Sequence, residues 1–353
     1  NPVFPDRHGV KSVALAYRGK PGVRSSRIKL DRTATYHCMS RVIQRQMLLG
    51  DVEKEYFRRL MRRIEDFCGV HIITYAIMTN HFHILVEVPC REEITDTELI
   101  RRIRLIYSAS FTDEVERQLG EFRQTGENEM AEALKARFTY RMYDVSEFMK
   151  TLKQRFTQWY NRNNGRKGTL WEERFKSVLL EGRPHALRTM AAYIDLNPVR
   201  AGLVEDPKDY RFCGYAEAVA GLDVAQAGLK RVVGDVAPDR DWRWSSRGYR
   251  QTLFERGAAS TDGTRIAPEK VRQVLEGRGE LSVGEVLRCR VRYFSDGVVL
   301  GSLEFVESVF QAHRDEFGLK RKTGARKMRY GSWGGLCTMR DLRSEVIAIP
   351  SPP

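Results

Sequence analysis

The stretch Met78-Thr79-Asn80-His81-Phe82-His83-Ile84-Leu85-Val86-Glu87 starts with a polar turn and continues as a run that predicts a β-strand. Successive strand side chains point to opposite faces, so His81 and His83 share one face and Phe82 lies on the other. Two imidazoles about 7 Å apart on one strand face can converge on a single divalent cation. The same spacing is also typical of two half-buried histidines that are bonded to backbone groups.

The elements around this strand follow the order of a ferredoxin-like fold. β-Branched and aromatic residues predict strands over 35–43 and 70–78, and a helical periodicity predicts a helix over 51–67 between them. An amphipathic helix over 146–160 precedes a further strand within 168–180. This order predicts an α+β fold in which helices pack on an antiparallel sheet.

Composition predicts four segments along the chain. Residues 1–30 are basic and rich in Gly, Pro and Ser, which predicts a flexible arm. Residues 31–220 form the main domain, with a charged helical insertion at about 91–145. Residues 221–265 are predicted to be a connector, and 266–345 a mostly helical C-terminal domain. That domain is either a DNA-binding helix-turn-helix or a plain helical bundle.

The charge of the chain indicates a polyanionic partner. Its 353 residues include 60 Lys and Arg against 46 Asp and Glu, which gives a formal charge of +14 and a pI near 9.6. An excess of this size points first to nucleic acid and second to an acidic membrane surface. A basic protein without either partner is the remaining possibility.

Cysteine usage and hydropathy favour a cytoplasmic protein. The six cysteines are scattered and none forms a C-x-x-C pair, which excludes a disulfide scaffold and a zinc ribbon. No run of 18 apolar residues is present, so no transmembrane helix is expected. Residues 1–21 lack the apolar segment of a signal peptide.

A second basic feature is the segment 320–329, KRKTGARKMR, which holds six cations and no acid. Such a cluster can lie along a phosphate backbone, where each neutralised phosphate adds to a salt-dependent affinity. A solvated tail is the alternative. The cations are Lys320, Arg321, Lys322, Arg326, Lys327 and Arg329.

A helix about a hundred residues after the histidines carries the other group of interest. Pro184 suits the first helical position and Asn197-Pro198 predicts the end. Tyr193 and Asn197 are four residues apart, so a phenol and an amide oxygen lie on one flank of this helix. Taken alone, Tyr193 is also compatible with a boundary aromatic whose hydroxyl reaches water.

The chain resembles the REP-associated tyrosine transposases, which belong to the single-tyrosine HUH transposase superfamily. Four sequence blocks over residues 31–215 carry this likeness, and they occur in the family's order. Two departures are Thr79, where the family usually has proline, and the length of the charged insertion. The blocks are 36–41 (YHCMSR), 78–87 (MTNHFHILVE), 168–177 (GTLWEERFKS) and 193–204 (YIDLNPVRAGLV).

The resemblance implies an HUH fold for residues 31–220 and a DNA strand-transfer chemistry. Tyr193 would attack a phosphodiester, giving a 5′-phosphotyrosine and a free 3′-hydroxyl. His81, His83 and Asn197 would be the metal ligands, and an oxygen beside two imidazoles suits Mg²⁺ or Mn²⁺. The implied substrate is single-stranded DNA with a palindromic, REP-like hairpin. The resemblance further implies a bacterial, nucleoid-associated monomer or homodimer.

Three cations near these blocks are further candidates for binding DNA. Arg174 and Lys176 are two apart on a predicted strand and would share a face, and Arg41 lies at the end of the first strand. Surface charge on an edge strand is the alternative for the first two. Trp171 is expected to pack in the core rather than to stack on a base.

Other functions stay open at this point. The chain could be a catalytically inactive regulator that binds hairpin DNA. It could also be an HUH replication initiator or relaxase, although no G-x-x-x-x-G-K-[ST] pattern of a companion helicase is present. A hydrolytic metalloenzyme that uses only the histidine pair would act without Tyr193.

Overall fold

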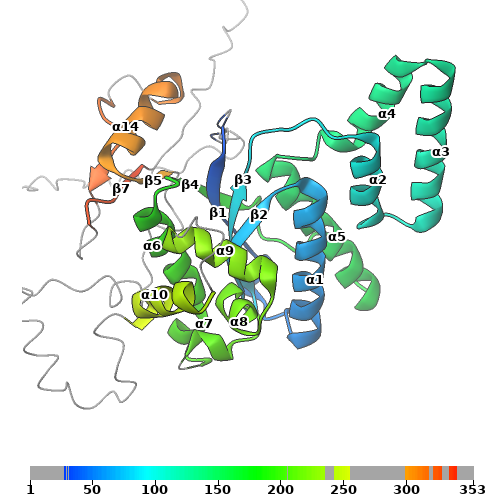
Figure 1. The fold of residues 1–353 in the computed structure, drawn as a ribbon. Helices are drawn as coiled ribbons and strands as arrows, with labels where there is room; N and C mark the ends of the chain where they lie inside the picture. Colours follow the sequence, from blue (N-terminus) through cyan, green and yellow to red (C-terminus); the bar gives the residue numbers. More distant parts are fainter. Residues whose placement is uncertain are drawn as a thin grey trace, which may run out of the picture.

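The computed structural model describes residues 28, 30, 32–204, 206–234, 242–254, 299–317, 321–327 and 334–339. Within these ranges the chain is an α+β protein built on one seven-stranded sheet, of order β2-β3-β1-β4-β5-β7-β6 (Figure 1). Among the described residues, no helix has the length and apolar character needed to cross a membrane.

The first four strands confirm the predicted ferredoxin-like order. Neighbouring strands in the series β2-β3-β1-β4 are all antiparallel. Helices link β1 to β2 and β3 to β4, and the two strands of each helix-linked pair are not adjacent in the sheet. The elements are β1 (Ala34–Arg41), α1 (Asp51–Cys68), β2 (His71–Ile77), β3 (His81–Val88), α5 (Val145–Asn163) and β4 (Lys176–Leu180).

Helices α1 and α5 cover one face of the sheet. Phe82 lies on this face and contacts Phe57 of α1, with ring centroids 4.7 Å apart, and Phe57 contacts Phe156 of α5 at 5.0 Å. Trp171 is 6 % exposed and packs against the same rings. Its indole nitrogen donates to Thr157 Oγ1 at 2.9 Å, which confirms the predicted core position.

Helices α6 (Pro184–Asp195) and α9 (Asp223–Val233) cover the opposite face (Figure 1). Helix α9 lies unusually close to β2 at Gly228. A Cβ atom there would stand 2.6 Å from the carbonyl oxygen of Ile73, so only glycine allows this approach. The residues 221–265 that were predicted as a connector therefore include a helix that packs on the sheet, and α10 (Trp242–Phe254) packs on α9.

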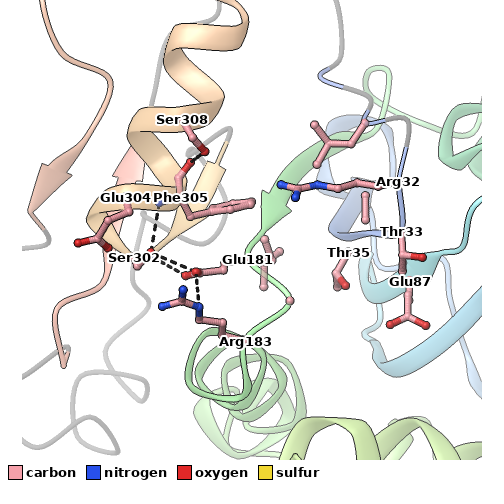
Figure 2. A pocket seen from close by; sticks show the side chains of 14 residues that line it. Arg32, Thr33, Thr35, Glu87, Glu181, Arg183, Ser302, Glu304, Phe305 and Ser308 are labelled. Atoms are coloured by element: carbon pink, nitrogen blue, oxygen red, sulfur yellow. Dashed lines mark hydrogen bonds and ion pairs between the residues drawn. The ribbon is translucent and has the colours of Figure 1, made fainter.

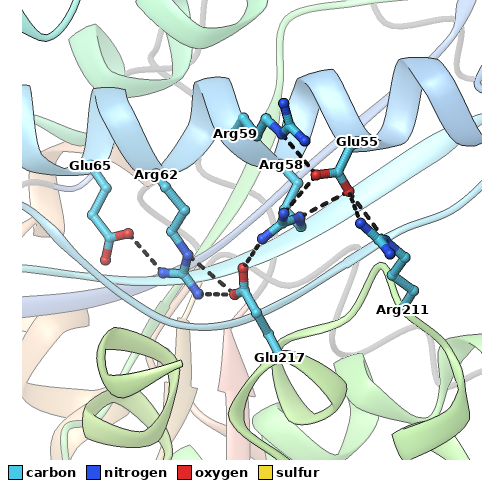
Figure 3. Close-up of polar contacts among 7 residues, drawn as sticks. All are labelled: Glu55, Arg58, Arg59, Arg62, Glu65, Arg211 and Glu217. Atoms are coloured by element: carbon cyan, nitrogen blue, oxygen red, sulfur yellow. Dashed lines mark hydrogen bonds and ion pairs between the residues drawn. The ribbon is translucent and has the colours of Figure 1, made fainter. Parts of the chain in front are cut away.

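The outer edge of β2 is closed by the segment that follows α6. Ile77 donates its backbone N–H to the Phe212 carbonyl, and α8 (Gly214–Val219) begins directly afterwards. The buried Glu217 of α8 accepts hydrogen bonds from Arg58 and Arg62 of α1 (Figure 3). These ion pairs join helices on the two sides of the sheet around its edge.

The helical segment predicted at 91–145 contains three helices that project away from the sheet (Figure 1). They pack mainly on one another, and several of their arginines pair with carboxylates of the same three helices, as Arg123 does with Asp96 at 2.9 Å. The helices are α2 (Asp96–Arg104), α3 (Ala109–Thr125) and α4 (Asn128–Thr139).

The described C-terminal residues extend the sheet beyond β4. Strand β5 (Val299–Gly301) pairs parallel to β4, and β7 (Cys337–Met339) and β6 (Arg326–Lys327) follow as antiparallel neighbours. Helix α14 (Leu303–Ala312) packs on β5 and β7. The sequence predicted the helix but not these short strands. The remaining short elements are η1 (Ile43–Arg45), α7 (Asn197–Arg200), η2 (Pro207–Asp209) and η3 (Arg314–Glu316).

Candidate active site

Strand register places three histidines on the face that α6 covers. In the β1–β3 pair, Met39 lies opposite His83 and Arg41 opposite His81. Residues directly opposite each other share a face, and so do residues two apart, which adds His37 to this group. His37 and His83 are buried, at 0 % and 2 % exposure, and His81 is half-buried.

The imidazoles of His81 and His83 are close and nearly perpendicular, with centroids 5.2 Å apart and an interplanar angle of 85°. Their Nδ1 atoms both have partners: Asn80 Oδ1 lies 2.7 Å from that of His81, and His37 Nε2 lies 2.9 Å from that of His83. Each ring would therefore present Nε2 to a cation.

This geometry suits a shared metal ion. When an imidazole nitrogen ligates an ion at about 2.1 Å, the ring centroid lies roughly 3.2 Å from that ion. The 5.2 Å between the two centroids therefore corresponds to a wide angle between the two rings at a shared ion. No group of three or more His, Cys, Asp or Glu side chains able to hold a metal occurs in the described ranges. Asn197 is the third ligand that the sequence resemblance implies.

Tyr193 lies directly against the buried histidines. Helix α6 presents its ring edge-on to His83, at a centroid distance of 5.8 Å and an angle of 89°, and to His37 at 6.1 Å. The ring is 3 % exposed. The structure thus brings the predicted nucleophile and the predicted metal-binding imidazole together within one chain.

Arg200 is a site residue that the sequence analysis missed. Its guanidinium lies 4.4 Å from the centre of the Tyr193 ring, and its Nη2 donates to the Tyr193 carbonyl at 2.7 Å. A cation over an aromatic face is attracted by the ring quadrupole. Spacing within helix α6 could not reveal this contact, because Arg200 belongs to the separate short helix α7.

Asn197 is held at the end of the tyrosine helix. Its Nδ2 donates to the carbonyls of Tyr193 and Ile194, both at 3.1 Å. These bonds use the amide nitrogen, and the amide oxygen is the only other atom of this side chain that can ligate a cation. The assignment of Asn197 as a metal ligand remains a prediction.

Burial lowers the pKa of His83 well below its ordinary value, and the nearby His37, His81, Arg200 and Arg41 lower it further. Neutral imidazole is the form that binds metals. The environment therefore keeps the His83 imidazole neutral at neutral pH.

The other side of α6 is anchored by Asp195. This carboxylate is 0 % exposed and accepts hydrogen bonds from Thr74 Oγ1 of β2 at 2.8 Å and from the Tyr249 hydroxyl of α10 at 2.5 Å. The Tyr215 backbone N–H donates to it as well. Burial raises the pKa of Asp195 to about 7, against the effect of these donors. Nothing in the sequence pattern indicated this network.

The predicted DNA-binding cations separate into two sets. Lys176 opens β4 opposite Met39, so it lies on the histidine face, and Arg41 lies opposite His81. Arg174 precedes β4 and lines a groove of about 800 Å³ beside α5. The prediction that Arg174 and Lys176 lie on one strand is therefore wrong.

The basic segment 320–329 lies partly outside the described residues, which leave out Lys320 and Arg329. Arg321 makes contacts within the protein: its guanidinium lies 4.7 Å from the Phe317 ring centre and donates a hydrogen bond to the Gly324 carbonyl. Lys322, Arg326 and Lys327 are exposed. Their contact with DNA stays a prediction.

A second hollow, of about 620 Å³, lies at the other end of the central strands (Figure 2). Its lining includes Glu181, which accepts hydrogen bonds from the backbone N–H and the hydroxyl of Ser302. Glu181 also forms an ion pair with Arg183. The histidines do not line it. We therefore assign the active-site candidate to the His83–Tyr193 region and not to this hollow.

Comparison with known proteins agrees with the sequence resemblance over part of the chain. Residues 32–126 match a family model described as "Transposase IS200 like". Comparison with curated proteins gives no match. A solved structure, described as a REP-associated tyrosine transposase bound to a REP hairpin, is 13 % identical with a TM-score of 0.34. The alignment covers 57 % of this chain and 90 % of that one. The segment that carries the histidine strand is thus similar to the IS200-like transposases.

Proposed function

We propose that the chain is a metal-dependent single-strand DNA endonuclease and strand transferase that acts on hairpin DNA, with Tyr193 as its nucleophile. The observation that carries this proposal is the edge-on contact of Tyr193 with the buried His83, at 5.8 Å between ring centroids. A phenol beside a potential metal ligand is an arrangement that suits metal-assisted attack of a tyrosine on a phosphodiester.

In the proposed reaction, the phenolic oxygen of Tyr193 bonds to phosphorus while the bond from phosphorus to the 3′ oxygen breaks. The 3′ oxygen gains a proton in place of the one that the phenol loses, so no water is consumed. A divalent cation, when bound by His81, His83 and Asn197, neutralises charge on the phosphoryl oxygens. The 5′-phosphotyrosine keeps the bond energy, so a 3′-hydroxyl can rejoin a strand without ATP.

Cations without a carboxylate partner among the described residues support a DNA substrate, and two of them, Arg41 and Lys176, lie on the histidine face of the sheet. Arg41, Arg174 and Lys176 form no ion pair with any carboxylate that the structure describes. By contrast, Arg101 and Arg123 in the projecting helices pair with Asp66 and Asp96. Positive charge without a protein partner favours a phosphate backbone. The choice of a palindromic hairpin rests on the sequence resemblance.

A DNA-binding regulator without nuclease activity is the second candidate, and the burial of the site favours it. Tyr193 and His83 are 3 % and 2 % exposed, so a phosphate reaches them only if neighbouring side chains move. Arg200 is half-buried and lies on the Tyr193 ring, so it is one of the side chains that cover the phenol.

A covalent-adduct assay separates the two candidates. Labelled single-stranded hairpin DNA is incubated with the protein and Mg²⁺ or Mn²⁺, and a denaturation-resistant protein–DNA band is expected. Tyr193→Phe should abolish the band and retain hairpin binding, and EDTA added beforehand should prevent the band. Tyr140→Phe, at a 52 % exposed tyrosine, is the matched control and should behave as wild type. An adduct that persists in Tyr193→Phe would exclude this nucleophile.

A further inference from the structure

His37 makes the most direct contact with His83. Its Nε2 lies 2.9 Å from His83 Nδ1, and the two ring planes are nearly parallel, with centroids 5.1 Å apart and an interplanar angle of 19°. His37 pairs with Leu85, two residue pairs along from the Met39–His83 pair, so the sheet register places it diagonally opposite His83 on the same face. Neither side chain can turn freely, because both are buried.

The bond between these imidazoles constrains their protons. A neutral imidazole has one N–H and one lone pair, so one ring donates and the other accepts. If His83 donates from Nδ1, its Nε2 carries the lone pair that a metal needs. If His37 donates instead, His83 Nε2 carries a proton and cannot ligate.

We propose that His37 is the positioning residue of the metal site: its Nε2 accepts the Nδ1 proton of His83 and thereby directs His83 Nε2 to the cation. This inference rests on the proposed function, because it assumes that His83 ligates a metal. His37 touches the ligand and not the cation. Partners of this kind fix the tautomer and the ring orientation of ligating histidines.

If His37 only filled space in the core, different substitutions would be tolerated at its position. For packing, an apolar side chain of similar size at position 37 would serve. For positioning, a hydrogen-bond acceptor at the place of Nε2 is essential. Glutamine can bring its amide oxygen near that place, whereas leucine offers shape without an acceptor.

The first test measures Mn²⁺ affinity of the full chain by electron paramagnetic resonance and calorimetry, in the absence of DNA. His37→Leu should weaken Mn²⁺ binding about 10- to 100-fold, and His37→Gln should stay within about threefold of wild type. His185→Gln removes an exposed histidine at the start of α6 and should leave the affinity unchanged. Thermal unfolding of each variant shows whether it is folded.

Equal affinities for wild type and a folded His37→Leu would overturn the positioning role and leave the proposed function intact. Equal losses in the leucine and glutamine variants, both folded, would also overturn it. Failure of the wild-type chain to bind Mn²⁺ would instead contradict the metal site of the proposed function. Failure of the positioning role and failure of the proposed function therefore give different results.

A second test needs no variant. Long-range ¹H–¹⁵N spectra of histidine-labelled protein report which ring nitrogen carries the proton. We expect His83 to be protonated at Nδ1 in the metal-free protein. Protonation at Nε2, with His37 as the donor, would contradict the proposal.

Discussion

The hydroxyl of Tyr249 on α10 donates a 2.5 Å hydrogen bond to the buried carboxylate of Asp195, two residues after Tyr193 on α6. Thr74 of β2 donates to the other carboxylate oxygen. Asp195 therefore ties the tyrosine helix to the sheet on one side and to α10 on the other.

Tyr249→Phe should destabilise the protein, because it removes a hydrogen bond to a carboxylate that has no access to water. The expected loss in the free energy of unfolding is about 1–3 kcal/mol, measured by urea denaturation. Adduct formation should fall more than hairpin affinity, since the displaced helix carries the nucleophile. Tyr140→Phe on the surface is the control, and an equal loss there would contradict the anchoring role.

Glu217→Ala should destabilise more strongly. Glu217 is 6 % exposed and bonds both Arg58 and Arg62, so its removal takes one carboxylate from each of two partly buried cations, which keep Glu55 and Glu65 as partners. Breaking a buried ion pair costs about 3–5 kcal/mol, and these remaining partners place the expected loss near the lower figure. Urea denaturation measures the loss. Glu114→Ala, which removes an exposed pairing with Arg117 on α3, should change stability little.

Stability should fall in acid through Glu55. Hydrogen bonds from Arg58, and then from Arg59 and Arg211, lower the pKa of Glu55 from 4.5 to about 2 (Figure 3). A carboxylate with a depressed pKa stabilises the fold fully above its unfolded pKa and loses this contribution as the pH falls through its folded value. Unfolding free energy measured between pH 5 and pH 2 should decline less steeply in Glu55→Gln.

The salt dependence of hairpin binding should identify the DNA-facing cations. Arg41→Gln and Lys176→Gln should each reduce the slope of log affinity against log salt by about 1, because each removes one phosphate contact. Arg117→Gln, at a paired arginine on α3, should leave the slope unchanged. Unchanged slopes in all three variants would place the DNA elsewhere.

A mixing experiment should show that one chain holds a complete site. His83 and Tyr193 meet within a single chain, so a mixture of His83→Ala and Tyr193→Phe proteins should form no adduct. Recovery of adduct in the mixture would show that two chains share their tyrosines.

Local pattern predicted the βαββαβ core, and the resemblance to a known family added the chemical roles of the two histidines and the tyrosine. Alternation in β3 indicated that His81 and His83 share a face, and helical spacing indicated a helix that ends near Asn197. Hydrophobic periodicity and turn residues depend only on positions that are close in the chain, so they can be read from the sequence without the fold. The short strands β5 to β7 escaped prediction because two or three residues are too few to show a period.

Only the tertiary structure decided which side chains surround the phenol. The contacts of His37 with His83, of Arg200 with Tyr193 and of Tyr249 with Asp195 join residues from separate elements. Strand register and helix packing create these contacts, and both depend on the burial of apolar surface across the whole chain. The sequence by itself therefore determined the nucleophile and the imidazole pair as candidates, and the fold alone decided that they meet.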